Sequence, residues 1–269
     1  MDARPVGVFD SGLGGLTTVK KLAEFLPGED IIYLGDTGRV PYGSRSKDTI
    51  VRYARQDAAF LAGFDIKAMV IACNTVCSVA FNDLNFSYGI PVYEVISIPV
   101  KAAAEVTRND KIGVIGTAAT IRSGAYEAAL KKIKPGVQVF SEPCPLFVHL
   151  AENGRTGLTD IAAITIAEDY LSGLRGSGID TLILGCTHYP LLRGVISQVM
   201  GSSVTLIDSG AETAVHIAKE LNALDMLAPG GSGGTIRYFV TDNADGFTTL
   251  AARFLESEVS GQVEQITLE

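Results

Sequence analysis

Short runs of apolar residues recur along the chain, and each run ends in small or polar residues. Apolar and polar side chains hardly alternate within a run, which is typical of strands covered on both faces, as in a parallel sheet. The pattern therefore predicts strands at Val6–Phe9, Ile31–Leu34, Ala68–Ala72, Val92–Ile96, Ile112–Ile115, Thr181–Leu184 and Val204–Ile207.

Helical spacing of apolar residues fills the segments between these runs. It is clearest in Thr49–Gly63 and Ala211–Leu227, where apolar side chains recur every three or four positions. A glycine-rich loop at 229–234, a strand at Arg237–Val240 and a helix at Phe247–Leu255 are predicted to follow. This alternation of strands and helices predicts an α/β fold with mainly parallel sheets.

Two pairs of segments look alike in the two halves of the chain. VGVFDSG at 6–12 resembles IGVIGTA at 112–118, and MVIACNT at 69–75 resembles LILGCTH at 182–188. The pairs keep the same order and nearly the same separation, although parallel strands in general share some of this character. We interpret them as a repeat, which predicts two similar, pseudo-symmetric α/β domains. Ligands of such sheets bind beyond the carboxyl ends of the strands, so the cleft between the domains is the expected site.

A cysteine stands at the end of one strand in each half, Cys73 in the first and Cys186 in the second. A helix that begins at such a position lowers the pKa of the thiol from ~8.5 toward neutrality. One cysteine after an apolar run is more often a small buried residue, but two in matched frames favour shared chemistry. Cys77 and Cys144 have no such counterpart, and we interpret them as packing residues.

Composition narrows the class of protein. The formal net charge is −8 and the pI about 5.0, whereas nucleic-acid and anionic-membrane surfaces require clustered Lys and Arg. A small anionic substrate is compatible with this negative net charge, because a few local hydrogen-bond donors suffice to hold it. No signal peptide is visible, and no apolar run approaches the ~18–20 residues of a membrane span. The four cysteines form no CxxC pair, so we expect no disulfide scaffold, no zinc site and a reduced, cytoplasmic setting.

Several polar residues at strand ends are candidates for chemistry. Asp10 begins DSGLGG, whose spacing is neither a dinucleotide fingerprint nor a Walker motif, and it suits a helix N-cap, a catalytic carboxylate or an ammonium ligand. His188 favours proton chemistry over a core role. Thr117 and Thr120 suit a carboxylate, a phosphate or simple N-capping. Glu152 has no evident role from spacing alone.

A resemblance to known proteins runs in order from residue 6 to about residue 215. Six segments carry it: VFDSGLGGL (8–16), PYG (41–43), ACNT (72–75), GTAAT (116–120), CPLF (144–147) and LGCTHYP (184–190). Together they resemble the glutamate racemases of the aspartate/glutamate racemase family. The two cysteine segments alone also suit aspartate racemases. The histidine of GCTHYP, together with DSGLGG and PYG, favours the glutamate enzymes.

The resemblance implies a cofactor-independent racemase that interconverts L- and D-glutamate and supplies D-glutamate for peptidoglycan. It implies that Cys73 and Cys186 transfer protons on opposite faces of the substrate, assisted by Asp10, Glu152 and His188. The residues that match the family's substrate-binding positions are Asp10, Ser11, Pro41, Tyr42, Gly43, Asn74, Thr75, Thr117, Thr120, Thr187 and His188.

The resemblance also implies a discontinuous first domain, residues 1–97 and 208–269, around a second domain of residues 98–207. His149 stands near Glu152, at a position where the family usually carries a proline. The match of Glu152 to the family's glutamate therefore depends on how this segment is aligned. The oligomeric state stays open, a homodimer included, and so do allosteric effectors.

Three other functions stay open at this point. Aspartate is the alternative substrate for the same chemistry. A non-catalytic amino-acid-binding module of similar fold would not need both cysteines at donor-rich strand ends. A thiol redox enzyme would respond to reductants, whereas a racemase would not.

Overall fold

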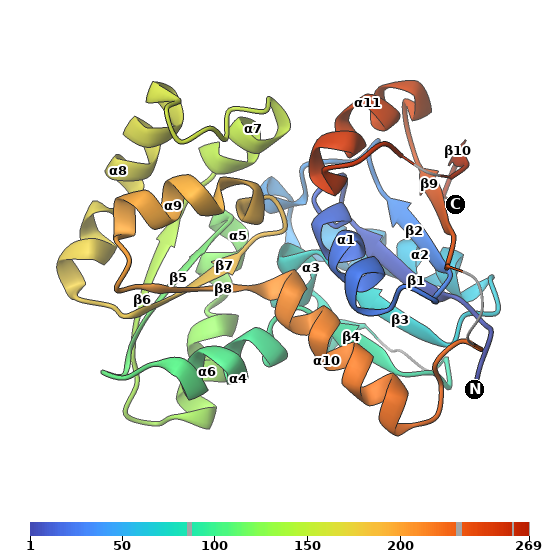
Figure 1. Ribbon diagram of the computed structural model, residues 1–269, viewed down its shortest axis with the longest axis horizontal. Helices are drawn as coiled ribbons and strands as arrows, with labels where there is room; N and C mark the ends of the chain where they lie inside the picture. Colours follow the sequence, from blue (N-terminus) through green and yellow to red (C-terminus); the bar gives the residue numbers. More distant parts are fainter. Residues whose placement is uncertain (85–87, 230–232, 260, 269) are drawn as a thin grey trace.

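The computed structural model describes residues 1–84, 88–229, 233–259 and 261–268. It consists of two parallel sheets flanked by helices (Figure 1). The first sheet is built from both ends of the chain and the second from its middle, and both termini lie on the first half. Residues 230–232 of the predicted glycine-rich loop lie outside the described residues.

The first sheet has the strand order β10-β9-β2-β1-β3-β4, and its paired strands are parallel. Its strands are β1 (Val6–Asp10), β2 (Ile31–Gly35), β3 (Ala68–Ile71), β4 (Val92–Glu94), β9 (Ile236–Val240) and β10 (Val263–Gln265). The helices packed around it are α1 (Leu16–Phe25), α2 (Lys47–Ala62), α3 (Asn74–Val79), α10 (Ser209–Ala223) and α11 (Ala244–Leu255), with 3₁₀ turns η1 (Tyr42–Ser44) and η2 (Phe81–Asp83).

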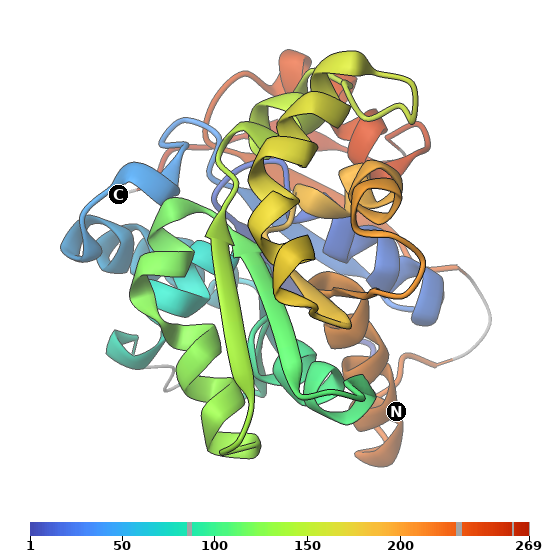
Figure 2. The ribbon, with the colours of Figure 1, turned by 90° about the vertical axis from the view of Figure 1, so that its left-hand side faces the viewer.

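The second sheet has the order β6-β5-β7-β8 and is also parallel. Its strands are β5 (Lys111–Gly116), β6 (Gln138–Pro143), β7 (Thr181–Gly185) and β8 (Thr205–Asp208). The helices of this half are α4 (Ser97–Val106), α5 (Ala118–Ser123), α6 (Ala125–Ile133), α7 (Leu146–Glu152), α8 (Ile161–Ser177) and α9 (Arg193–Met200), with the 3₁₀ turn η3 (Tyr189–Leu192). Figure 2 shows this sheet between the green helix α6 and the yellow helix α8.

The two sheets share one arrangement of strands. The first contains β2-β1-β3-β4 and the second β6-β5-β7-β8, so β1 corresponds to β5 and β3 to β7. This confirms the prediction of two similar α/β halves. Cys73 and Cys186 therefore follow equivalent strands, β3 and β7, at their carboxyl ends.

The predicted strands all form, with small differences at their ends. β4 stops at Glu94, two residues early, because the Glu94 carboxylate accepts hydrogen bonds from the backbone of Ile96 and Ser97 at 2.6 and 2.7 Å. Helix α10 ends at Ala223, before the predicted Leu227, and Asp225 adopts a left-handed backbone with φ 55°. Such a residue commonly follows a helix end.

Two strands had no sequence signal, and the predicted strands do not include them. β6 is an edge strand whose side chains are half-buried or exposed, and Ser141 and Glu142 interrupt its apolar pattern. A strand whose side chains are only partly covered needs no continuous apolar run. β10 has three residues and is also at an edge.

The core continues from one half into the other. One face of the first sheet packs on α1, α10 and α11 around Val8 and Leu16. The opposite face packs on α2 and α3, and this cluster extends into the second half through Val114 and Leu130. A third cluster lies under α7, α8 and α9. Within the described ranges, no helix has the length and apolar character needed to cross a membrane.

Candidate active site

A small cavity of about 50 Å³ lies where the carboxyl ends of the two sheets meet, and both candidate cysteines line it. The predicted site residues in its wall are Ser11, Pro41, Tyr42, Gly43, Cys73, Asn74, Thr75, Thr117, Cys186, Thr187 and His188. Three predicted residues, Asp10, Glu152 and Thr120, are not in the wall. The structure thus brings together residues from both halves around one cavity.

Cys186 belongs to a chain of three interacting side chains. Its Sγ lies 3.9 Å from Nδ1 of His188, and Nε2 of His188 lies 3.2 Å from a carboxylate oxygen of Glu152. Burial alone would lower the pKa of His188, but its hydrogen bonds with Cys186 and Glu152 outweigh burial and raise the pKa to about 10. The imidazole is therefore an imidazolium at neutral pH, placed between a thiol and a carboxylate.

Glu152 takes part in the site through its contact with His188. Glu152 is the last residue of α7, and its backbone carbonyl accepts a hydrogen bond of 2.7 Å from Arg253 of α11. The hydrogen bond from His188 lowers the pKa of the Glu152 carboxyl. His149 lies one turn earlier on α7 and does not displace Glu152 from its contact.

Cys73 has different surroundings. It caps the N-terminus of α3, and its thiol donates to the hydroxyl of Ser11 at 3.3 Å. Burial and the nearby Asp10 carboxylate raise the pKa of Cys73 to about 12. The prediction that a helix start lowers the thiol pKa is therefore wrong for Cys73, because α3 is only six residues long and its field is weaker than the cost of burying a thiolate.

Asp10 lies at the end of β1, completely buried next to this thiol. One carboxylate oxygen accepts a hydrogen bond of 2.9 Å from the backbone of Gly12, and Oδ1 has no partner among the described residues. Burial raises the pKa of Asp10, against an opposing effect of the His188 charge. Asp10 is not the N-cap of α1, which is Gly15, so that alternative is wrong.

The glycines of DSGLGG allow this loop to lie against the second half. A Cβ on Gly14 would come within 2.1 Å of the Thr187 hydroxyl and 2.5 Å of Nδ1 of His188. Thr17 donates to the backbone carbonyl of Thr187 at 2.9 Å. The close approach, which only glycine permits, holds the Cys186–His188 turn against the first half.

Neutral donors from both halves face the cavity. The hydroxyls of Thr75 and Thr117 are 3.0 Å apart, and Thr120 lies 3.0 Å from Thr117 behind the wall. Thr117 also caps α5. The amide nitrogen of Asn74 is buried without a partner in the described part of the chain, while its oxygen accepts a 2.5 Å hydrogen bond from Tyr126.

A buried ionic network fixes the loop that carries Pro41 and Gly43. The Tyr42 hydroxyl bonds to Asp36 and, at 3.1 Å, to Asp57, and Arg39 pairs with both carboxylates at 2.6 and 3.0 Å. Burial and the Asp36 charge raise the pKa of Asp57 well above its usual range, although Arg39 opposes them.

Sequence reasoning missed the supporting residues Asp36, Asp57 and Tyr126, and the apolar wall residues Val40 and Val148. Asp36 follows β2 directly, and a carboxylate at a buried strand end was the signal that could have found it. Asp57 and Tyr126 reach the site through hydrogen bonds to Tyr42 and Asn74, residues of other elements. No lysine or arginine among the described residues lines the cavity.

Comparison with known proteins gives consistent matches. The family model described as Asp/Glu/Hydantoin racemase matches residues 16–217. The chain is 48% identical to the glutamate racemase of Geobacter metallireducens, covering 100% of this chain and 98% of that protein. It is 45% identical to that of Neisseria gonorrhoeae, covering 98% and 97%. The crystal structure of glutamate racemase from Francisella tularensis in complex with D-glutamate has a TM-score of 0.91 and 38% identity, covering 100% and 99%.

Proposed function

Because the chain belongs to the Asp/Glu/hydantoin racemase family, we propose that it interconverts L- and D-glutamate by proton transfer between two cysteines. The observation that carries this proposal is that Cys73 and Cys186, from equivalent strands of two sheets, line one cavity. Inversion of a stereocentre requires a base on one face of the α-carbon and an acid on the other. Two thiols held by separate halves meet that requirement.

The surroundings of the two thiols differ, which suggests different roles for the two cysteines in the resting enzyme. The imidazolium of His188 lies 3.9 Å from the Cys186 sulfur, and Glu152 keeps that imidazole charged. The high pKa of Cys73 keeps it a neutral thiol. In one direction Cys186 takes the α-proton and Cys73 delivers its own to the opposite face; in the other direction the roles exchange. The protonation state belongs to the pair.

Asp10 is proposed to assist Cys73, as Glu152 and His188 assist Cys186. Its buried carboxyl has a raised pKa and an unpartnered oxygen. A protonated carboxyl there can return a proton to the Cys73 thiolate after turnover, and an ionised one can bind the substrate ammonium. Ser11 orients the thiol through its hydroxyl.

The neutral donors of the wall are proposed to bind the two carboxylates of glutamate. Asn74, Thr75 and Thr117 offer an amide and hydroxyls from both halves, and Thr187 and Ser11 complete the set. Donors aimed at the α-carboxylate stabilise the charge that develops on it as the α-proton leaves. Exclusion of water by the bound substrate strengthens those interactions. On this route the reaction proceeds without a cofactor.

Glutamate is preferred over aspartate because the full-length relatives are glutamate racemases. Initial rates on L-glutamate and L-aspartate, followed by circular dichroism without added cofactor, decide between the two. We also propose that the enzyme works in the cytoplasm and supplies D-glutamate for peptidoglycan. Growth of a bacterium that requires D-glutamate, rescued by this chain, tests that role.

The experiment that tests the mechanism is racemisation in heavy water with Cys73→Ser and Cys186→Ser. We expect both variants to lose racemisation almost completely. Any residual exchange of the α-proton should favour opposite enantiomers in the two variants, because each retains the base on one face only. Undiminished racemisation by either variant would refute the two-base mechanism.

Cys77→Ser is the matched control, because this buried thiol donates to the backbone carbonyl of Ile71 at 3.3 Å and lies outside the cavity wall. We expect it to retain activity. Binding of glutamate with no turnover by the wild type would indicate a binding module instead. If the protein shows no racemisation, and its two cysteines are instead reversibly oxidised and then reduced by a thiol reductant, a redox enzyme would be indicated.

A further inference from the structure

A buried tyrosine of the second half reaches across to the residue that follows Cys73. The Tyr126 hydroxyl lies 2.5 Å from the amide oxygen of Asn74, at the start of α3, and 3.2 Å from the backbone carbonyl of Val95. Gly124, with a left-handed φ of 67°, ends α5 and lets α6 begin at once, which brings Tyr126 to this place. Tyr126 is 3% exposed and is not among the described residues in the wall of the cysteine cavity. It therefore acts on the site only through the residues that it contacts.

The direction of the hydrogen bond decides which end of the Asn74 amide faces the cavity. A separation of 2.5 Å is typical of O–H···O bonds and shorter than most N–H···O bonds, so the oxygen of Asn74 faces Tyr126. Burial raises the pKa of Tyr126 well above its usual range, so the hydroxyl keeps its proton and donates it. The amide nitrogen has no partner among the described residues, although Asn74 is 3% exposed and lines the cavity. A buried donor of this kind costs free energy until a ligand accepts its hydrogen bond.

The ring of Tyr126 packs against the segment that carries the second cysteine. A Cβ on Gly185, the last residue of β7, would come within 3.1 Å of the ring. Cys186 follows this glycine directly. One side chain thus contacts the residue after Cys73 through its hydroxyl and the residue before Cys186 through its ring.

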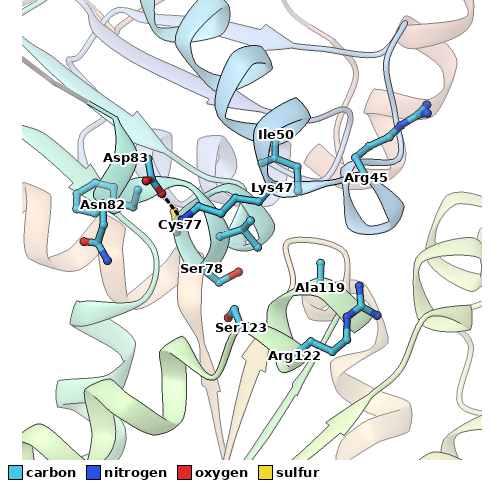
Figure 3. Close-up of a pocket in the computed structure, with 12 residues that line it drawn as sticks. Arg45, Lys47, Ile50, Cys77, Ser78, Asn82, Asp83, Ala119, Arg122 and Ser123 are labelled. Atoms are coloured by element: carbon cyan, nitrogen blue, oxygen red, sulfur yellow. Dashed lines mark ion pairs between the residues drawn. The ribbon is translucent and has the colours of Figure 1, made fainter.

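The neighbouring contact between the two halves, α3 against α5, is of a different kind. It borders a second cavity, of about 420 Å³, where Ser78 and Ser123 lie near each other (Figure 3). Ser78 donates to the carbonyl of Thr75 at 3.1 Å, and Ser123 to that of Thr120 at 2.7 Å, each within its own helix. These serine hydroxyls bind within one half, whereas the Tyr126 hydroxyl fixes a residue of the opposite half.

We propose that Tyr126 is a positioning residue for the reaction: it holds the Asn74 amide with its nitrogen toward the cavity, where that nitrogen donates to a carboxylate of the substrate. This inference rests on the proposed racemase function, because glutamate supplies the carboxylate. Without the Tyr126 hydroxyl, the amide can turn its oxygen toward the cavity, and an oxygen there repels a carboxylate. The carboxylate carries its charge before the α-proton is removed, so the loss should raise KM more than it lowers kcat.

Steady-state racemisation by Tyr126→Phe, which keeps the ring against Gly185, tests the proposal. We expect KM for L-glutamate to rise about tenfold, as for the loss of a hydrogen bond to a charged group, while kcat falls less. Because Tyr126 acts through Asn74, the same change in an Asn74→Ala background should alter KM by less than about twofold. An unchanged KM in Tyr126→Phe, or an equal rise in both backgrounds, would overturn the proposal.

Tyr189→Phe is the matched control. Tyr189 is also a buried tyrosine of the second half, and its hydroxyl donates to the backbone carbonyl of Cys144 at 2.8 Å. Its substitution should lower the stability to urea about as much as Tyr126→Phe does, but leave KM close to that of the wild type. An equal rise in KM in both variants would attribute the effect to general loosening of the second half and would also overturn the positioning role.

A measurement without turnover separates this inference from the proposed function. In the NMR spectrum of the side-chain amides, the Asn74 signal is the one that is lost in Asn74→Ala. We expect Tyr126→Phe to shift that signal and Tyr189→Phe to leave it in place, whether or not the protein racemises glutamate. Such a shift in a wild type that shows no racemisation would refute the proposed function and support the orientation of Asn74. An Asn74 signal that Tyr126→Phe leaves unchanged would contradict the inference even in an active racemase.

Discussion

The two thiols of the cavity differ because different groups stand next to them. A histidine and, behind it, a carboxylate face Cys186. A serine hydroxyl and a buried carboxyl face Cys73. A cation beside a thiol favours the thiolate, and burial beside a carboxyl favours the thiol. In the proposed reaction the two sulfurs share one proton, which is the state that a two-base mechanism requires.

This asymmetry predicts the effect of removing the imidazole. In wild type we expect the ultraviolet absorbance of one thiolate at neutral pH. His188→Gln should abolish it, because the amide keeps a polar contact but supplies no positive charge. Cys186→Ser should abolish it equally, and Cys73→Ser should leave it in place. Persistence of the signal in Cys186→Ser would assign the resting thiolate to Cys73.

The carboxylate behind the imidazole predicts a pH dependence. The pKa of His188 in the folded protein, about 10, lies above the ~6.5 of an unfolded histidine. Its protonation therefore stabilises the fold fully below pH ~6.5, and this contribution is lost as the pH rises through about 10. Glu152→Gln removes one of the groups that raise this pKa, so the loss should occur at lower pH. Imidazole NMR titration and urea unfolding at a series of pH values measure both effects.

The exposed pair His216–Glu220 offers the control for that experiment. The two side chains lie 2.9 Å apart on α10 and are 46% and 38% exposed. Such surface pairs contribute little to stability. Glu220→Gln should therefore leave the pH dependence of unfolding close to that of wild type. An equal change in both variants would mean that general charge, not the buried contact, governs it.

Both cysteines could be predicted from sequence because a buried strand that ends in a thiol leaves a recognisable pattern. The protonation of Cys73 could not be, because it depends on how deeply the residue is buried and on Asp10, a neighbour from another strand. The sequence shows that a helix starts after Cys73, which favours a low thiol pKa. It does not show the burial of the thiol, which raises the pKa by more. Burial is a property of the assembled sheets.

At the scale of elements, the loop between β2 and α2 depends on its buried anchor. The Tyr42 hydroxyl lies within hydrogen-bond distance of the Asp36 and Asp57 carboxylates and has one proton to donate to them; burial raises its pKa, so the hydroxyl keeps that proton. The same turn presents Pro41 and Gly43 to the cavity. Tyr42→Phe retains the ring but leaves Asp36 and Asp57 without this donor. We expect a loss of ~1.5–3 kcal/mol in unfolding free energy and a several-fold higher KM for glutamate, with kcat changed less.

Tyr53→Phe is the control for that change. Tyr53 packs against Tyr42 and under the Arg39 guanidinium, 4.1 Å from the ring centre. Its substitution removes a hydroxyl from the same neighbourhood without removing a bond of the network. An equal rise in KM in both variants would show that general loosening, and not the anchor, is responsible.

Strands could be predicted from the sequence where burial on both faces requires a run of apolar residues. They could not be predicted where the side chains are only partly covered. β6 is the counterpart of β2 in the second half, yet Ser141 and Glu142 occupy it because its side chains are only half-buried or exposed. The anchor of Tyr42 is visible in the sequence only at Asp36, which follows a buried strand; its partner Asp57 lies on helix α2. Contacts of this kind depend on the packing of one element on another.

At the scale of the whole molecule, the chain leaves the first half, builds the second and returns. The point of return is held by a buried cation. Lys67 forms an ion pair with Glu29 and donates to the backbone carbonyls of Asp2 and Met226 at 2.7 and 2.8 Å. Glu29 in turn accepts from the backbone of Ala228 at 2.7 Å. One ion pair thus joins the N-terminus, the first sheet and the connection after α10.

Removing one partner of this pair leaves the other charge buried. Lys67→Met should therefore lower the unfolding free energy by ~3–5 kcal/mol. The double variant Lys67→Met, Glu29→Gln removes both charges and retains the acceptor for Ala228, so it should be more stable than Lys67→Met alone. Urea unfolding with an unchanged dependence on denaturant measures both values. If the double variant were the less stable of the two, the hydrogen bond from Ala228 to the Glu29 carboxylate would outweigh the cost of burying that unpaired charge.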